Sequence, residues 1–403
     1  MRKVFIILVV ILIIAAIGVG VYFGLKKAPS AIMGGGGVEE KNLPVGGGVG
    51  GGTQGVGTTI PTGTTSVTSD QQAERLQKQR QQLSVFSTQP AVDYLLVAGT
   101  VTKATSTPAV QYYLNQKGEL IQIQDVNKEQ VVSTTGNFGT PVYLKQNADG
   151  SKAVVYFDSG KFVIFDSKTK VWSELDSGIS DVTFSPSGKN IAFLKPSGVN
   201  ISLYTRDITS TKKTLTLVAT LAIQDFNLIW PDANKIFLVS KPSDKYNGEI
   251  WYFDLQQKTI NKFDSGIGLS VLFSYPYDYG MKFVSQDRSI MAVSIINKSG
   301  KKLADMPFST LSTKCAFSFD SKSVYCAVPE TFNKDGFILP DDYLKGGLYT
   351  KDAIYKIDLA SAEITRIIDS STALIDAVNL RLSGNSLYFI NRYNNQLYRF
   401  NLE

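Results

Sequence analysis

Short runs of alternating apolar and polar residues, separated by polar turns, fill most of the chain beyond residue 83. Two clear examples read DVTFSPSGKNIAF at residues 181–193 and KCAFSFDSKSVYCAV at residues 314–328. A period of two places the apolar side chains on one face of a β-strand. Each stretch therefore predicts a hairpin of two strands that bury one face.

The hairpin recurs along the chain at intervals of roughly 40–45 residues. With Ser185 as the reference turn position, the equivalent positions are Asn147, Trp230, Ser274, Ser318 and Arg381. The last interval is longer because residues 329–352 form an insertion. The recurrence indicates one structural unit that the chain repeats.

A second pattern marks the third strand of the unit and reads IWYFDL at 250–255, IYKIDL at 354–359 and LYRFNL at 397–402. Asp254, Asp358 and Asn401 end these strands. A side-chain oxygen at this position can accept hydrogen bonds from the backbone of the following turn. We therefore assign these three residues no catalytic role.

Units of this length with four short strands are typical of a β-propeller, in which stacking the sheets buries surface that one sheet cannot bury alone. We predict an all-β, seven-bladed propeller, with six or eight blades as the alternatives. The seven units span about residues 91–135, 141–177, 179–222, 224–265, 267–308, 311–370 and 373–403. The last unit holds three strands, which would leave an open edge. Residues 83–87 are therefore predicted to complete blade seven and close the ring.

The string FSPSGKNIAF followed by ISLYTRD resembles the repeat of TolB-type and WD-repeat-like propellers, which often reads Ser-Pro-Asp-Gly at this turn. The resemblance covers roughly residues 83–403 and implies a fold rather than an activity, because propellers host many unrelated functions. Ser187 stands where that pattern has Asp, and Trp230 stands where it has Ser. The N-terminal segments, with the strings VYCAV and LPDDYLKGG, also resemble membrane-anchored propeller proteins of Candidate Phyla bacteria.

The N-terminal region predicts a membrane anchor and a linker. Residues 4–25 carry no charge, and as a helix they would span about 33 Å, enough to cross a hydrocarbon core of about 30 Å. We expect a retained single-pass anchor of the cytoplasmic membrane, with the C-terminal domain extracytoplasmic; a cleaved signal peptide is the alternative. Residues 34–57 contain 12 glycines, which predicts a flexible tether. The chain thus divides into an anchor at 1–28, a Gly/Thr/Ser-rich linker at 29–69, a short polar helix at 70–82 and a propeller at 83–403.

Charge and composition narrow the classes of function. The net charge is +6, and residues 1–82 hold 8 basic and 4 acidic residues, so +4 of the excess lies there and +2 in the rest. A nearly neutral body lacks the basic surface that nucleic acid requires, so we predict no nucleic-acid partner. The chain contains no histidine, which excludes His-dependent catalytic triads and imidazole metal sites. We predict no catalytic residue, cofactor or metal site, and therefore no enzyme.

Cys315 and Cys326 are the two cysteines of the chain. They flank the turn of one predicted hairpin at positions equivalent to Val182 and Phe193, which places them opposite each other on one face. Such a pair has the Cα separation that a disulfide needs. Two buried thiols that act as small hydrophobic groups are the alternative.

Two loops are candidate binding regions. The insertion carries Phe332, Phe337, Asp341, Asp342 and Tyr343, and a second turn carries Tyr275, Tyr277 and Tyr279. Aromatic residues beside acidic residues can contact a protein or stack on a sugar, and a tyrosine cluster can be a recognition patch. The alternatives are an insertion that folds back with its aromatic rings packed inward, and tyrosines that serve only the turn.

Together these features predict a membrane-anchored, extracytoplasmic propeller that binds an envelope or surface protein. A saccharide-binding or glycan-active propeller is the alternative, and a purely structural envelope component is a third. A central channel lined by Asp, Glu and Arg would favour glycan chemistry. An apolar channel would favour protein binding. The sequence does not determine the partner or the oligomeric state.

Overall fold

The computed structural model describes residues 69–101, 106–107, 109–125, 128–210, 212, 214–222, 225–330 and 337–402. The predicted anchor and most of the predicted linker, residues 1–68, lie outside the described residues. Within the described ranges, no helix has the length and apolar character that a bilayer crossing requires.

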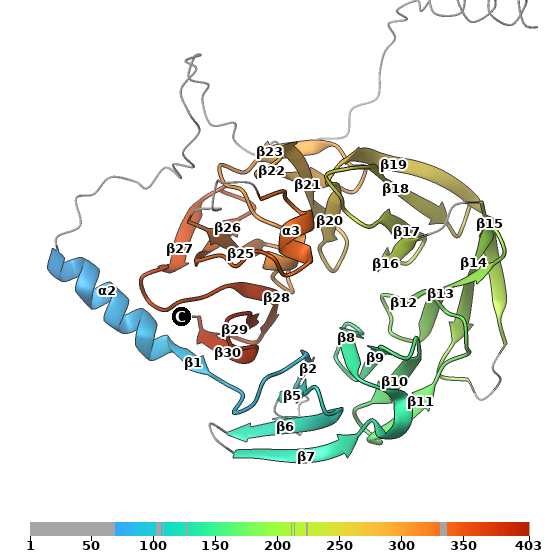
Figure 1. Ribbon diagram of the computed structural model, residues 1–403, viewed down its shortest axis with the longest axis horizontal. Coiled ribbons are helices and arrows are strands. Elements are labelled where there is room, and N and C mark those ends of the chain that lie inside the picture. The colour runs from blue at the N-terminus through green and yellow to red at the C-terminus, as the bar shows by residue number, and fades with distance from the viewer. Residues whose placement is uncertain are drawn as a thin grey trace, which may run out of the picture. The chain divides into compact units, whose positions relative to one another are not determined.

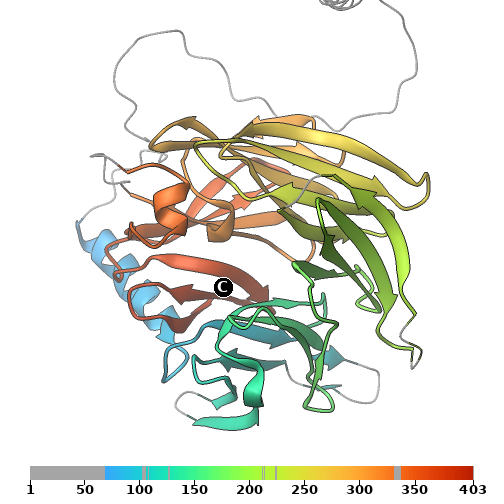
Figure 2. The ribbon, with the colours of Figure 1, turned by 45° about the vertical axis from the view of Figure 1, so that its right-hand side comes forward.

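Seven four-stranded antiparallel sheets follow one another around a common centre, which confirms the predicted all-β, seven-bladed propeller (Figures 1 and 2). In blades 1 to 6 the four strands pair in chain order, with the first strand of each blade nearest the centre. Each blade is a meander whose apolar positions alternate, because successive side chains of a strand point to opposite faces.

The strands have the following bounds. Blade 1 contains β2 (Asp93–Val97), β5 (Val110–Leu114), β6 (Glu119–Asp125) and β7 (Lys128–Thr134), and blade 2 contains β8 (Pro141–Gln146), β9 (Lys152–Phe157), β10 (Phe162–Asp166) and β11 (Val171–Glu174). Blade 3 contains β12 (Asp181–Phe184), β13 (Asn190–Ser197), β14 (Asn200–Asp207) and β15 (Thr216–Leu221), and blade 4 contains β16 (Phe226–Asp232), β17 (Lys235–Ser240), β18 (Asn247–Asp254) and β19 (Thr259–Ile267).

The second half of the ring continues the same order. Blade 5 contains β20 (Ser270–Phe273), β21 (Tyr279–Asp287), β22 (Ile290–Asn297) and β23 (Lys302–Asp305), and blade 6 contains β24 (Cys315–Phe317), β25 (Ser323–Pro329), β26 (Asp352–Asp358) and β27 (Ile364–Ile368). Blade 7 contains β28 (Ala377–Ser383), β29 (Ser386–Asn391), β30 (Gln396–Asn401) and β1 (Leu83–Val85). The remaining described elements are α2 (Ser69–Gln82), α3 (Asp341–Leu344), the 3₁₀ helices η1 (Gly136–Phe138) and η2 (Ser312–Lys314), and a small sheet of β3 (Thr100–Val101) and β4 (Ser106–Thr107).

The ring closes through β1, the first strand of the described residues. β1 pairs antiparallel with β30, with Leu83 opposite Phe400 and Val85 opposite Tyr398. This confirms the prediction that the segment after residue 82 completes blade seven. In Figure 1 the N-terminal β1 lies beside the C-terminal β30, so two ends of the propeller domain share one sheet.

The hydrophobic core is divided among the junctions between blades. Among the described residues there are seven clusters of buried apolar side chains, and each joins two neighbouring blades. The cluster between blades 2 and 3, for example, joins Val154 and Ile164 to Val182 and Phe193. The cluster between blades 7 and 1 joins Leu397 to Tyr94. Since seven blades share seven junctions, each blade packs against a neighbour on both of its faces.

In most blades the side chain at the repeated turn position stabilises its own hairpin by a hydrogen bond to the backbone. In four blades its side-chain oxygen accepts a hydrogen bond, of 2.9 to 3.1 Å, from the backbone N–H five residues later; these residues are Asn147, Ser185, Ser274 and Ser318. Trp230 and Arg381 offer no such oxygen. Their hairpins are tighter instead, with Asp232 paired to Lys235 and Ser383 paired to Ser386.

The aspartates that end third strands also serve the turns. Asp254 accepts hydrogen bonds from the backbone N–H groups of Gln256 and Gln257, and Asp358 does the same for the two residues that follow Leu359. The Asn401 side-chain oxygen accepts a hydrogen bond from the Ser386 hydroxyl instead. These contacts are structural.

Helix α2 attaches to the ring through polar contacts. Its sequence has no apolar stripe, yet Gln79 is buried and its side-chain oxygen accepts bonds from the Asp369 N–H and the Thr372 hydroxyl. Arg75 pairs with the Asp369 carboxylate at 3.2 Å. Burial acts to raise the pKa of Asp369, but hydrogen bonds from Ser371 and Arg366 outweigh it and lower this pKa to about 2. The helix therefore docks on a carboxylate that stays ionised.

Deleting residues 70–90, which contain α2 and β1, is expected to lower the melting temperature sharply. The deletion exposes the edge of β30 and the apolar junction between blades 7 and 1. Thermal unfolding followed by circular dichroism measures the effect, with a deletion of equal length in the linker, residues 45–65, as the control. An unchanged melting curve would refute the closure.

Candidate functional site

In two blades, an aspartate at the start of the first strand connects the blade to both of its neighbours. Asp181 accepts a hydrogen bond from the Leu228 N–H of the next blade at 2.6 Å and pairs with Lys145 of the preceding blade at 2.7 Å. Asp93 does the same with the Leu144 N–H at 2.9 Å and Arg381 at 3.0 Å. Both aspartates are buried. Their charges are therefore committed to the structure of the ring.

A larger buried network joins blades 6 and 7. Lys314 is fully buried, and its ammonium group lies 2.6 Å from Asp352 and 2.7 Å from Asp376. Arg392 adds a second cation at 3.1 Å from Asp376. Asp352 also accepts a bond from the Ala377 N–H at 2.8 Å. Two cations face two carboxylates, so the network is balanced in charge.

The ionisation of this network follows from burial and attraction. Burial alone lowers the pKa of Lys314, but the charges around it, first that of Asp352, outweigh burial and raise the pKa above its usual value. Burial raises the pKa of Asp352. At Asp376 burial acts in the same direction, yet Lys314 and the hydrogen bonds lower the pKa overall. Lys314 therefore stays charged at neutral pH.

The insertion is fastened to this network through Tyr343 of α3. The Tyr343 hydroxyl donates a hydrogen bond of 2.6 Å to Asp376, and the buried ring lies 4.2 Å from the Arg392 guanidinium. The Tyr343 pKa is raised, mainly by burial. In both ribbon views α3 lies over the ring rather than outside it (Figures 1 and 2).

The other candidate binding residues of the insertion do not form one exposed surface in the described part of the chain. Phe332 lies outside the described residues. Phe337 packs against the core between blades 5 and 6. Asp341 accepts bonds from the Ser243 hydroxyl and the Asp244 N–H, and Asp342 accepts one from the N–H of residue 338. The described part of the insertion therefore folds back onto the ring with Phe337 and Tyr343 packed inward.

A cavity of about 480 Å³ lies beside α3, and we call it the insertion-side cavity. Its walls are formed by the first strands β16 and β20, the end of β17, η2 with the residue before it, and the insertion. Its apolar lining consists of Ile229, Val239, Pro242, Val271, Leu311, Pro340 and Leu344. Asn227, Ser240, Ser270, Ser312, Thr313, Lys241, Asp341 and Lys345 complete it. Of the candidate residues, Asp341 is the one that contributes directly to this cavity.

An exposed aromatic pair lies on the same side of the ring. Tyr349 and Tyr393 are 52% and 43% exposed, and their ring centroids are 5.4 Å apart. The Arg392 guanidinium lies 4.8 Å from the Tyr349 ring. Leu374 and Leu344 are exposed as well. Tyrosine and arginine are the residue types that dominate binding energy in protein interfaces.

The three tyrosines of the second candidate do not form one patch. Tyr277 is buried in the core between blades 4 and 5, and Tyr279 packs against the core between blades 5 and 6. Tyr275 is partly exposed and donates a hydrogen bond of 2.6 Å to the Pro186 carbonyl. The prediction of a shared tyrosine surface is therefore wrong, because Tyr277 and Tyr279 pack into two different junctions between blades and Tyr275 alone is partly exposed.

Tyr275 does border a second cavity, of about 230 Å³, at the opposite end of the first strands. We call it the far-side cavity. Aromatic rings from three blades line it, namely Phe184, Trp230, Phe273 and Tyr275. Thr183, Lys145 and Gln146 are among its polar residues.

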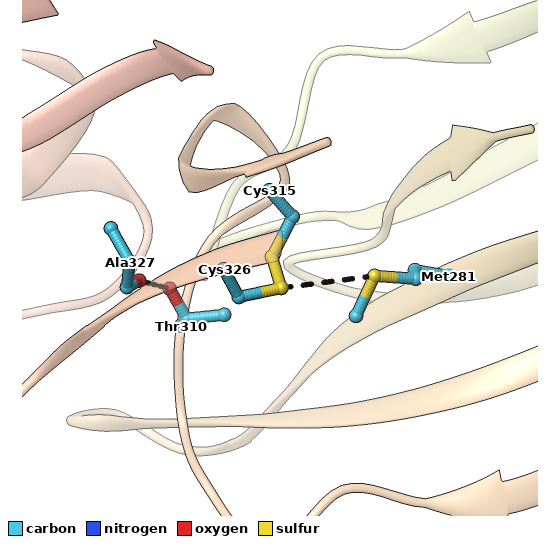
Figure 3. The surroundings of a disulfide bond; sticks show 5 residues. All are labelled: Met281, Thr310, Cys315, Cys326 and Ala327. Carbon is cyan, nitrogen blue, oxygen red and sulfur yellow. Dashed lines mark hydrogen bonds between the residues drawn. A yellow bond between two sulfur atoms is a disulfide. The ribbon is translucent and has the colours of Figure 1, made fainter. Parts of the chain in front are cut away.

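The two cysteines form a disulfide (Figure 3). They face each other in the β24–β25 pair, as Val182 and Phe193 do in blade 3, with Cα atoms 4.1 Å apart. The Cys326 sulfur lies 4.0 Å from the Met281 sulfur of blade 5. Since a disulfide sulfur carries no hydrogen, this is a packing contact. The bond therefore lies inside the core between blades 5 and 6.

The sequence pattern did not reveal the residues that hold the insertion in place or the exposed residues beside it. These are Lys314, Thr350, Asp352, Asp376 and Arg392 in the network, and Tyr349 and Tyr393 outside it. One signal was present: an aspartate begins or directly precedes the first strand in blades 1, 3, 4 and 7, although Asp225 of blade 4 is exposed. No signal marked the ion-pair partners, which are 16 to 62 residues apart in the sequence.

Among the described residues, no group of three acidic or cysteine side chains could hold a metal ion.

Comparison with known proteins shows the fold. No family model matches the chain, and no curated protein does. A chain in the crystal structure of the mitotic checkpoint complex is similar with a TM-score of 0.51 and 12% identity, over 79% of this chain and 96% of that one. The β-propeller domain of Cps50 (Swd1) from Myceliophteria thermophila has a TM-score of 0.50 and 8% identity, over 80% of this chain and 100% of that one. An oligogalacturonate lyase in complex with manganese has a TM-score of 0.49 and 8% identity, over 80% and 90%.

The first two likenesses show a β-propeller fold. At 8–12% identity they show the shared architecture and nothing about binding or catalysis. The function has to be argued from the side chains of this chain.

Replacing Lys314 by Met is expected to lower the free energy of unfolding by about 3–5 kcal/mol, because two carboxylates then share a buried site with one cation. Chemical denaturation measures the loss. Lys322→Met in the same blade is the control; that side chain is exposed, so its effect should stay within about 0.5 kcal/mol. Equal stability of the two variants would contradict a structural role for the network.

Thiol labelling tests the disulfide. The protein unfolded without reductant should show no reactive thiol, and reduction should release two. Reduction should also lower the free energy of unfolding by at most about 3 kcal/mol, since the closed loop is short. Two free thiols without reductant would exclude the bond.

Proposed function

We propose that this protein is a membrane-anchored, extracytoplasmic β-propeller that binds a protein of the cell envelope through the face carrying the insertion. The observation that carries the proposal is the exposed Tyr349–Tyr393 pair beside Arg392, of which Tyr349 belongs to the same insertion that lines an apolar cavity at Leu344. Such a surface has the composition of an interface centre. The proposal involves no reaction.

The distribution of carboxylates supports binding rather than glycan cleavage. Asp93, Asp181, Asp352 and Asp376 are buried and engaged with cations or backbone N–H groups. Cleavage of a glycosidic bond uses a pair of carboxyl groups that reach the substrate. Apolar side chains, among them Ile229, Val271 and Leu344, also form a large part of the insertion-side cavity, and they can receive an apolar side chain of a protein partner.

The location is part of the proposal and rests on two features. Residues 4–25 have the length and apolar character of an anchor, although they lie outside the described residues. The disulfide supports an oxidising compartment, since disulfides form and persist there and are rare in the cytosol. The Gly-rich linker would then hold the propeller away from the bilayer.

Saccharide binding is a second candidate, favoured by the far-side cavity. Its wall offers several aromatic faces, among them Trp230 and Tyr275, beside the polar residues Thr183 and Gln146. Aromatic faces stack on sugar rings while polar groups bond the hydroxyls. A glycan array probed with the wild-type protein and with Trp230→Phe would test it; a positive array that Trp230→Phe leaves unchanged would speak against this cavity.

Site-specific photocrosslinking in native membranes tests the protein-binding proposal. A benzoylphenylalanine at position 349 should give an adduct with one envelope protein, because that ring lies in the proposed interface. The matched control places it at Phe319, which is exposed at the opposite end of the blade. Tyr393→Ala should reduce the adduct at position 349 several-fold. Equal adducts from both positions, or none from position 349, would contradict the proposal.

A further inference from the structure

The insertion-side cavity combines an apolar interior with a cationic rim. Its volume of about 480 Å³ falls within the range of about 300–1,000 Å³ that is usual for ligand sites. The apolar side chains come from five segments of the chain, so a bound group would be enclosed on several sides. Lys241 and Lys345 line the same cavity and are 64% and 67% exposed.

The single carboxylate in the lining is already engaged. Asp341 accepts bonds from the Ser243 hydroxyl at 3.2 Å and from the Asp244 N–H at 2.6 Å. Its distance to the Lys345 ammonium group is 3.6 Å. Lys241 pairs at 2.7 Å with Asp225, which is itself largely exposed. Exposed ion pairs contribute little free energy, so either lysine can change partner at low cost.

We infer that this cavity binds a segment of a partner protein in which a large apolar side chain is flanked by acidic residues. The apolar side chain would enter the cavity, and the neighbouring carboxylates would meet Lys241 and Lys345. The inference rests on the proposed function and specifies its ligand.

A protein segment fits better than a single amphiphilic molecule because the binding surface continues beyond the cavity. Leu344 and Lys345 border the cavity, and the same insertion leads on to the exposed Tyr349 with its partner Tyr393. A peptide chain can contact both places at once. Ser270, Ser312, Thr313 and Asn227 in the lining can hydrogen-bond peptide groups.

The test measures binding to the full chain in nanodiscs. The probe is acetyl-Glu-(5-fluoro-Trp)-Glu-amide, observed by ¹⁹F NMR. Unlabelled Glu-Trp-Glu, Gln-Trp-Gln and Glu-Ala-Glu peptides of the same form compete with it. We expect Glu-Trp-Glu to compete at least tenfold better than the other two, because one lacks the charges and the other lacks the apolar side chain.

Two variants locate the site. Lys345→Glu and Leu344→Ser should each reduce the affinity for the probe at least fivefold. Both positions are exposed, so the fold should tolerate the substitutions. Lys322→Glu makes the same charge change at an exposed position of the opposite end and should leave binding unchanged. Binding that survives both cavity variants would overturn the inference.

Other outcomes separate this inference from the proposed function. The inference would be overturned if Gln-Trp-Gln competed as well as Glu-Trp-Glu, or if the probe did not bind. Either result would overturn it even if position 349 still crosslinks to a protein. Displacement of the probe by dodecanoate at a tenfold lower concentration than by Glu-Trp-Glu would overturn it in favour of a lipid. Specific binding of Glu-Trp-Glu without any crosslink from position 349 would support the inference and contradict the proposed function.

Discussion

The structure depends on one constraint: a four-stranded sheet of about forty residues cannot bury both of its faces by itself. Each hydrophobic cluster in the described chain accordingly contains side chains from two blades. The stability of a blade is therefore shared with its neighbours. The same constraint explains why β1 pairs with β30, since an incomplete last blade would leave both an open edge and an uncovered junction.

Charge is used to reinforce the junctions near the centre of the ring. Asp93 and Asp181 each connect three consecutive blades through one cation and one backbone N–H. The Lys314 network connects blades 6 and 7 and also holds the insertion in place through Tyr343. A buried carboxylate is costly unless it is paired, so these groups are stable only in the complete ring. Because these charges already have partners inside the ring, contacts with other molecules fall to the outer loops.

The insertion connects the stability of the ring to its proposed function. Its described part packs Phe337 and Tyr343 inward, forms one wall of the insertion-side cavity and presents Tyr349 beside Tyr393 on the surface. A binding surface built on a loop that is fastened at several points loses little entropy on association. This is a physical reason to place recognition on the side of the ring that carries the insertion.

Local pattern was sufficient to predict the strands, the repeated turn and the closing strand. The turn oxygen of Ser185 and its equivalents acts on a residue five positions away, and the opposed cysteines lie in one hairpin, so both interactions are local in sequence. Tyr277 and the Lys314 network could not be predicted in this way. Whether a tyrosine faces solvent or core depends on the next blade, and Lys314 meets Asp376 across 62 residues of sequence. The sequence by itself determined the repeated unit and its alternating faces, whereas only the tertiary structure decided which charges became buried partners and which aromatic rings stayed exposed, because those outcomes depend on contacts between blades.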